Sequence, residues 1–289
     1  MPHRSMARAA ASSSATTTGG HPSFSSFFTQ ILGGYYATAF VRGIEFGIIC
    51  SQTWFIFRSV FRRKRENPAF RILVAWMTIV ALIQTVLSIY RAYYMLIIHF
   101  ADFTTVLKLT WAGKINFILD TLMIIPSQTF FLWRYWTMSK HNRRISMCLS
   151  ILLAGCLSST IAETQKVAGK NIAHSPNDPY FIPYIVFPAV LNASLSACLA
   201  WTYLKKQSES QEKRRFISSC QLPVIIWDAC LPPTICQWAL VISYLASGAM
   251  DFWPTVLHGA KGQLSAIAFL IALFVPLSIS LYASGCEPG

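Results

Sequence analysis

The sequence predicts an all-α, polytopic membrane protein with seven transmembrane helices, its N-terminus outside and its C-terminus in the cytoplasm. Three observations indicate this fold. Of the 289 residues, 54% are hydrophobic and only 12% are charged, against about 25% charged in a soluble domain. Seven long apolar segments follow one another, each near the roughly 20 residues that a helix needs to cross the hydrocarbon. The loops between these segments alternate between rich and poor in Lys and Arg.

The chain divides into a tail, a bundle and a short end. Residues 1–34 are rich in Ser, Thr and Ala and contain no acidic residue and no apolar core long enough for a signal peptide. We expect a disordered tail here, with a transit peptide as the alternative. Residues 35–283 are predicted to form the seven-helix bundle, and residues 284–289 a short cytoplasmic tail. Because seven helices and their loops use the chain, and the mean hydropathy is +0.46, a separate soluble domain is not expected.

The predicted helices have apolar interiors with aromatic or basic residues at their ends, as the membrane interface favours. The first opens with Tyr35 and Tyr36. The second continues into an apolar stretch at 93–100, which extends the helix or lies at the interface. Their ranges, in order, are 35–58, 70–90, 112–136, 145–168, 180–204, 217–246 and 255–283.

The later predicted helices also have aromatic or basic residues at or near their ends. The third ends at Trp136, the fourth follows two arginines, the fifth opens with Tyr180, and Trp253 precedes the seventh. The sixth contains the Pro232-Pro233 pair and is therefore expected to be the most irregular, because proline removes a backbone donor and kinks a helix.

The basic loops predict the orientation. The first, third and fifth loops hold most of the 24 Lys and Arg residues, and the positive-inside rule places such loops in the cytoplasm. We expect anionic lipid headgroups of the bilayer to contact these loops. The net charge of +13 is explained in this way, so nucleic-acid binding is not expected. A multi-pass protein of the plasma membrane is favoured, with an endomembrane as the alternative. The residues expected to anchor this topology are Arg62, Arg63, Lys64, Arg65, Arg143, Arg144, Arg214 and Arg215.

Motifs of known chemistry are missing from the sequence. There is no His-x-x-x-His pair for a metal, no phosphate loop, no Gly-x-Ser-x-Gly and no dinucleotide fingerprint. We therefore expect no enzyme activity, no catalytic residue, no metal and no cofactor.

Four ionisable residues inside the predicted spans are the candidate site, because a charge at the bilayer centre costs about 2.5–3.5 kcal/mol on insertion scales. Glu45, Asp120, Asp228 and Lys261 could line a polar pocket for a ligand or an ion. The structural alternative is that Arg42 neutralises Glu45, while Asp120 or Asp228 pairs with Lys261 to hold helices together. The sequence leaves both interpretations open.

The sequence favours neither a retinal protein nor a receptor with an acidic-Arg-Tyr motif. A retinal Schiff base needs a lysine at mid-depth, whereas Lys261 is expected in the outer third of the seventh helix. Trp133-Arg134-Tyr135 ends the third helix where many receptors carry an acidic residue before Arg-Tyr, so Arg134 is expected to be an interface anchor.

The first helix, with Gln52 followed by aromatic residues, resembles the opening helix of a large group of basidiomycete integral membrane proteins. Gln128, Phe130, Phe131 and Arg134 resemble that group's Gln-x-Phe-Phe-x-x-Arg element, although Asn192 stands where the group commonly has Asp. The resemblance implies a fungal seven-helix protein with its N-terminus outside, from a group whose function is unknown. Three functions are therefore weighed: a receptor-like sensor of an unknown ligand, which is favoured, a small-solute or proton-coupled transporter, and a non-catalytic scaffold.

Overall fold

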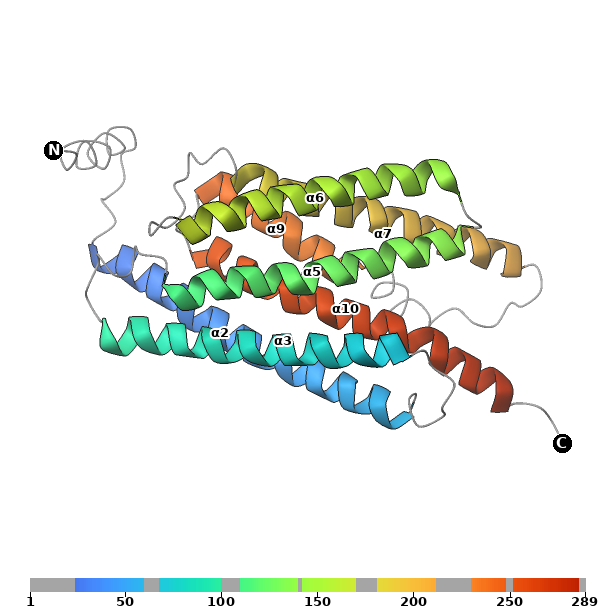
Figure 1. Ribbon diagram of the computed structural model, residues 1–289, viewed down its shortest axis with the longest axis horizontal. Helices are drawn as coiled ribbons and strands as arrows, with labels where there is room; N and C mark the ends of the chain where they lie inside the picture. Colours follow the sequence, from blue (N-terminus) through green and yellow to red (C-terminus); the bar gives the residue numbers. More distant parts are fainter. Residues whose placement is uncertain are drawn as a thin grey trace.

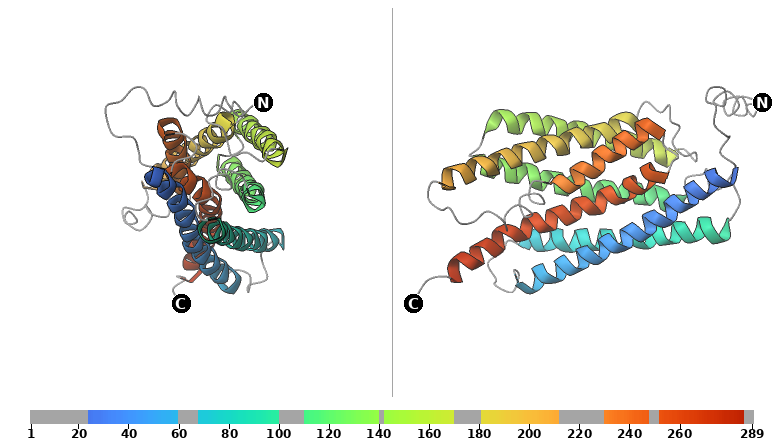
Figure 2. Two further views of the ribbon diagram at one scale, coloured as in Figure 1. Left: turned by 90° about the vertical axis from the view of Figure 1, so that its left-hand side faces the viewer. Right: turned by 180° about the vertical axis from the view of Figure 1, so that it is seen from behind.

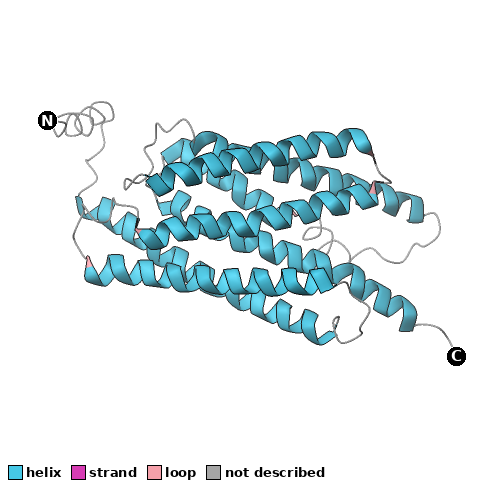
Figure 3. Ribbon diagram, in the orientation of Figure 1, coloured by secondary structure: helices cyan, strands magenta, loops and turns pink. Residues whose placement is uncertain are grey.

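The computed structural model describes residues 24–59, 68–99, 110–139, 142–169, 181–211, 230–247 and 252–285, and these residues form an all-helical bundle (Figures 1 and 3). Seven α-helices lie within the described ranges, which confirms the predicted fold class. They are α2 (Phe24–Ser59), α3 (Pro68–Tyr93), α5 (Trp111–Met138), α6 (Arg143–Gly169), α7 (Phe181–Gln211), α9 (Leu231–Ser247) and α10 (Phe252–Gly285). A single π-helical turn, η2 (Tyr94–Ile98), extends α3, as the apolar stretch at 93–100 suggested.

Five helical segments are long and apolar enough to cross a membrane, and they comprise α3 with η2, α5, α6, α7 and α10. The two remaining helices differ for separate reasons. α2 has 36 residues but carries Arg42 and Glu45 in its interior. α9 has 17 residues, fewer than the roughly 20 that a perpendicular span requires.

The helix ends differ from the prediction in two places. α2 begins at Phe24 rather than at residue 35, so the last part of the predicted tail is helical, while residues 1–23 lie outside the described part. α9 begins at Leu231, directly after a turn at Cys230, while residues 217–229 of the predicted sixth segment lie outside the described residues. The Pro232-Pro233 pair therefore lies in the first turn of a helix, where a missing backbone donor is tolerated, and not in a helix interior.

The outward faces of the helices are apolar and the inward faces carry polar groups. On α3, Ile72, Ile79 and Val86 are more than half exposed, whereas Gln84 and Ser88 are buried. A water-soluble protein has the opposite arrangement, because it buries apolar groups and hydrates polar ones. This distribution is the one that a lipid environment requires, and it supports a multi-pass membrane protein.

α10 is the central helix of the bundle (Figure 2). It packs against α2, α5 and α9, and α2 also packs against α3. The first and last described helices are therefore neighbours, and the start of α2 and the end of α10 lie at opposite ends of the bundle (Figure 1).

The ends of α2, α5 and α7 lie at the same end of the bundle as the start of α6 (Figure 1). Arg143 and Arg144 begin α6 there and are exposed, as expected for residues that anchor a topology. The other six predicted anchors fall outside the described residues: Arg62, Arg63, Lys64, Arg65, Arg214 and Arg215. We call this end the basic end; its position in the cytoplasm stays a prediction.

Candidate functional site

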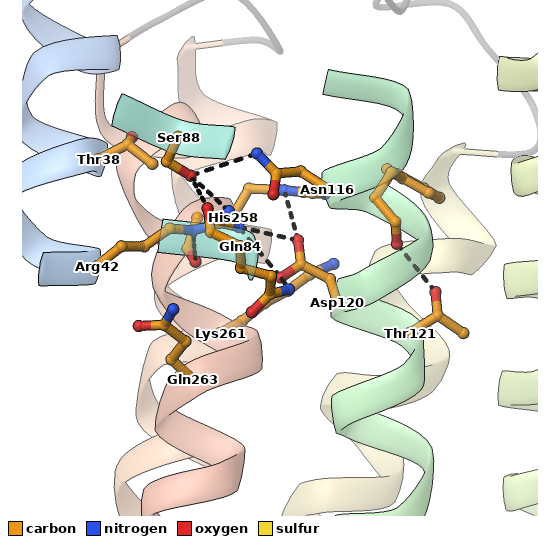
Figure 4. A network of polar contacts seen from close by, with 12 residues as sticks. Thr38, Arg42, Gln84, Ser88, Asn116, Asp120, Thr121, His258, Lys261 and Gln263 are labelled. Atoms are coloured by element: carbon orange, nitrogen blue, oxygen red, sulfur yellow. Dashed lines mark hydrogen bonds and ion pairs between the residues drawn. The ribbon is translucent and has the colours of Figure 1, made fainter. Parts of the chain in front are cut away.

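A buried arginine joins three helices to α2. Arg42, which is 3% exposed, donates from Nε to the carbonyl of Gly259 on α10 at 2.9 Å. Its Nη1 donates to Ser88 Oγ on α3 at 2.7 Å. Its Nη2 donates to both carboxylate oxygens of Asp120 on α5, at 3.1 and 3.2 Å. The three guanidinium nitrogens thus bind three different helices, and Figure 4 shows these side chains converging between α2, α3, α5 and α10.

Asp120 is the acidic partner of this arginine. It is 1% exposed, and Oδ1 also accepts a hydrogen bond of 2.8 Å from Gln84 Nε2 on α3. The close approach of α10 makes the geometry possible, because Gly262 has no side chain where it faces Asp120: a Cβ there would lie 2.6 Å from Oδ1. Removing one partner of such a buried ion pair costs about 3–5 kcal/mol, so the pair fixes how α2, α5 and α10 sit together.

Carboxamides and hydroxyls complete the network. Asn116 donates to Ser88 Oγ at 3.3 Å, and Gln263 donates to Thr85 Oγ1 at 3.1 Å. Since each amide nitrogen has a protein acceptor, the amide orientations follow from the network. The oxygens Gln84 Oε1, Asn116 Oδ1 and Gln263 Oε1 are buried and have no hydrogen-bond partner in the described part of the chain.

Lys261 lies on a different face of α10 from Gln263 and contacts α7. Its Nζ, in a side chain 2% exposed, donates to Tyr184 Oη. Tyr184 Oη also lies 3.2 Å from His258 Nε2. His258 Nδ1 lies 3.9 Å from Asp120 Oδ2. His258 and Lys261, three residues apart on α10, therefore meet at one phenol oxygen.

We call this whole set the polar layer. It comprises Arg42, Gln84, Thr85, Ser88, Asn116, Asp120, Tyr184, His258, Lys261 and Gln263.

The partners of Arg42 and Lys261 differ from those expected in the structural alternative. Arg42 binds Asp120 and not Glu45, and Lys261 binds a phenol and not a carboxylate. Glu45 is 5% exposed, and its Oε2 has no hydrogen-bond partner among the described residues. Glu45 follows Arg42 by three residues on the same face of α2, so it lies beside the polar layer. Asp228 lies outside the described residues, and its role stays a prediction.

A second polar group lies further along α5. Gln128 Nε2 donates to Asn192 Oδ1 on α7 at 3.1 Å, and Cys156 Sγ on α6 lies 3.7 Å from Gln128 Oε1. These contacts tie α5, α6 and α7 together in the middle of the bundle. Gln128 and Asn192 were noted in the sequence only through the resemblance to the basidiomycete group.

Beyond these polar groups the core is apolar. Along α10, the residues from Ala266 to Leu273 are apolar, and all of them except Ile271 are buried. Phe130 on α5 packs edge-on against Phe269 on α10, with ring centroids 4.8 Å apart. We call this the apolar layer; its members are Val74, Met77, Phe130, Phe131, Ala266, Phe269 and Leu270. Along α10 it lies between the polar layer and the basic end.

Arg134 lies on the basic side of the apolar layer. Its Nη1 donates to the carbonyl of Ala272 on α10 at 2.6 Å. It therefore joins α5 to α10, in addition to any role at the membrane interface.

The uncharged polar side chains of the site were not predicted from the sequence. Gln84 and Ser88 are four residues apart on α3, and Asn116 and Asp120 are four residues apart on α5, so each pair lies on one helical face. Polar residues at this spacing within an apolar helix are a signal of an inward face. Glu163 on α6, which is fully buried, was also not singled out.

Within the described residues, no group of three His, Cys, Asp or Glu side chains could hold a metal ion. No known protein family, no curated protein and no solved structure matches the chain. The resemblance to the basidiomycete group therefore stays a prediction, and the functional argument rests on the geometry of the polar layer.

Proposed function

We propose that the protein is a receptor-like membrane sensor, in which the polar layer reads a signal and the basic end carries the response. The observation that supports this function is the asymmetry of the core. The buried ionisable and amide side chains of the polar layer, from α2, α3, α5, α7 and α10, gather in one half, and along α10 the apolar layer follows them toward the basic end. A charged network placed toward one end of the bundle suits a sensor that receives a signal at one end and responds at the other.

The ion pair supplies an element that can take two arrangements. The guanidinium of Arg42 contacts three neighbouring helices, so a change in its pairing alters the packing of all of them. Buried charge pairs in membranes mark functional sites because their cost is high. A signal that competes for Asp120 would release α2 from α5 while α5 stays joined to α10 through Arg134.

A scaffold is the second candidate, because most donors in the polar layer are satisfied within the protein. A network that only holds helices together would show the same hydrogen bonds. The two functions differ in what a local change does at a distance: a scaffold loosens near the change, whereas a sensor also responds at the basic end.

Amide hydrogen exchange of the full chain in lipid nanodiscs tests this difference. We expect Asp120→Asn, which keeps the size of the side chain, to raise exchange severalfold in residues 131–150, at the basic end of α5 and α6. Ser127→Ala is the matched control, since Ser127 is buried on the same helix and, among the described residues, its hydroxyl bonds to Met123 O of that helix alone. Faster exchange confined to the polar layer would support the scaffold.

Transport is tested separately. Vesicles loaded with a pH-sensitive dye and reconstituted with the protein are expected to leak protons at the rate of protein-free vesicles, because the apolar layer interrupts the polar residues. A leak that increases with the amount of protein would overturn the sensor in favour of a carrier.

A further inference from the structure

We propose that the signal read by the polar layer is the proton concentration, and that His258 is the group that takes up the proton. This inference rests on the sensor function proposed above and names its ligand. It is carried by the position of the imidazole between two buried partners, the phenol of Tyr184 at 3.2 Å and the carboxylate of Asp120 at 3.9 Å.

His258 is the accessible member of this chain of contacts. Its side chain is 24% exposed, whereas Asp120 is 1% exposed and Lys261 is 2% exposed. Since His258 lies only six residues after the start of α10, close to one end of the bundle, this exposure gives protons a short route to the imidazole while its partners stay buried. Histidine is also the side chain that ordinarily changes charge between about pH 5 and 8.

The network fixes the hydrogens when His258 is neutral. Lys261 Nζ has only hydrogens to give, so Tyr184 Oη accepts from it and keeps its own hydrogen for another acceptor. His258 Nε2 is that acceptor. The ring hydrogen therefore sits on Nδ1, which faces Asp120 Oδ2. In this state α10 is joined to α7 by two hydrogen bonds that share one phenol oxygen.

Protonation of His258 at Nε2 changes this arrangement. Nε2 then carries a hydrogen and no longer accepts one from Tyr184. The lysine ammonium and the imidazolium both direct hydrogens at the same phenol oxygen, and their like charges repel. At the same time the imidazolium is attracted to Asp120, whose carboxylate is bound to Arg42. Proton uptake thus weakens the contact between α10 and α7 and competes for the central ion pair.

Other ionisable groups surround this site and contribute to the electrostatic potential at the imidazole. Asp120 and Tyr184 face the imidazole directly, and Lys261 and Arg42 act on it through them. Phe117, which is not ionisable, stacks on the ring with centroids 5.7 Å apart. The helices around α10 carry further ionisable side chains in this half, among them Tyr35 and Glu45 on α2, Tyr90 and Arg91 on α3, Lys114 on α5, Glu163 and Lys166 on α6, and Cys236 and Tyr244 on α9.

Amide exchange at pH 8 and pH 5, corrected for the intrinsic effect of pH, tests the proposal on the full chain in nanodiscs. We expect residues 252–262 of the wild-type protein to exchange at least threefold faster at pH 5 than at pH 8. His258→Gln should remove this difference. His99→Gln, which changes a histidine at the end of η2, should retain it. A wild-type response that survives in His258→Gln would overturn the proposal.

A second variant keeps the test decisive if His258→Gln does not fold. Tyr184→Phe retains the imidazole but removes the shared oxygen, so residues 252–262 should exchange at the fast rate at both pH values. A pH response of wild-type size in Tyr184→Phe would overturn the mechanism.

The two proposals can fail separately. If pH has no effect through His258 while Asp120→Asn still alters the basic end, the proton is not the signal and the sensor function stands. If Asp120→Asn leaves the basic end unchanged, the sensor function itself fails.

Discussion

Replacing Gly262 with alanine tests the close approach on which the polar layer depends. A Cβ at this position would lie 2.6 Å from Asp120 Oδ1 and 3.5 Å from Asp120 Cα. The carboxylate cannot simply rotate away, because Arg42 and Gln84 hold it. We therefore expect Gly262→Ala to push α10 and α5 apart or to break one of these hydrogen bonds.

The free-energy cost of the steric conflict at Gly262 is best measured against a second glycine that serves as a matched control. Gly47 also lies in a helix interior, and a Cβ there would meet nothing within 4 Å. Gly47→Ala should therefore leave the stability unchanged or raise it by about 0.5–1 kcal/mol. Both variants make the same chemical change in a helix, so the intrinsic effect of alanine cancels. The difference between them isolates the steric conflict, which is about 1–3 kcal/mol for an overpacked core.

The assay is unfolding of the full chain in mixed micelles by increasing detergent denaturant, followed by tryptophan fluorescence. We expect Gly262→Ala to unfold at a lower denaturant fraction than Gly47→Ala, by the difference in free energy given above. If Gly262→Ala proved as stable as Gly47→Ala, α10 would not approach α5 as closely as described, and the geometry of the polar layer would be wrong.

Three further outcomes are expected. Arg42→Lys should lower the free energy of unfolding by about 3 kcal/mol or more, because one ammonium cannot reach three helices and leaves buried partners unpaired. Its control, Arg143→Lys at an exposed helix start, should change the free energy of unfolding by less than about 0.5 kcal/mol. Phe269→Ala should cost about 3–5 kcal/mol by opening a cavity in the apolar layer, and a change below about 1 kcal/mol would contradict the packing seen with Phe130. An epitope tag at the N-terminus should bind antibody on intact cells, and labelling only after permeabilisation would show that the predicted orientation is reversed.

The fold follows from the sequence because lipid imposes a simple rule. Long apolar segments must form helices to satisfy their backbone groups, so the helix count and most ranges could be predicted within a few residues. The start of α2 was placed too late because residues 24–34 are polar enough to suggest a tail. The sixth segment was predicted as one helix, whereas Cys230 has a positive φ and the prolines after it begin a new helix, α9.

The partners within the site could be predicted only in part. Charged residues are conspicuous in an apolar helix, so Asp120 and Lys261 were identified, but pairing depends on helix rotation and depth. Arg42 lies three residues from Glu45 in sequence, yet it binds Asp120 from a distant segment. Tyr184 resembles an interfacial aromatic residue in the sequence, and only the structure shows that its side chain reaches α10 and accepts from Lys261.

The contact between Arg42 and the carbonyl of Gly259 has a consequence for biosynthesis. The two residues are 217 positions apart, whereas Arg42 and Asp120 are separated by 78. At about 5–20 residues per second, roughly 10–40 s pass between the synthesis of Arg42 and that of its last partner. During that interval the nascent chain carries an arginine whose first acceptors are Ser88 on α3 and then Asp120 on α5. Assembly of the bundle is therefore ordered in time, with the ion pair formed early and the final helix closing around it.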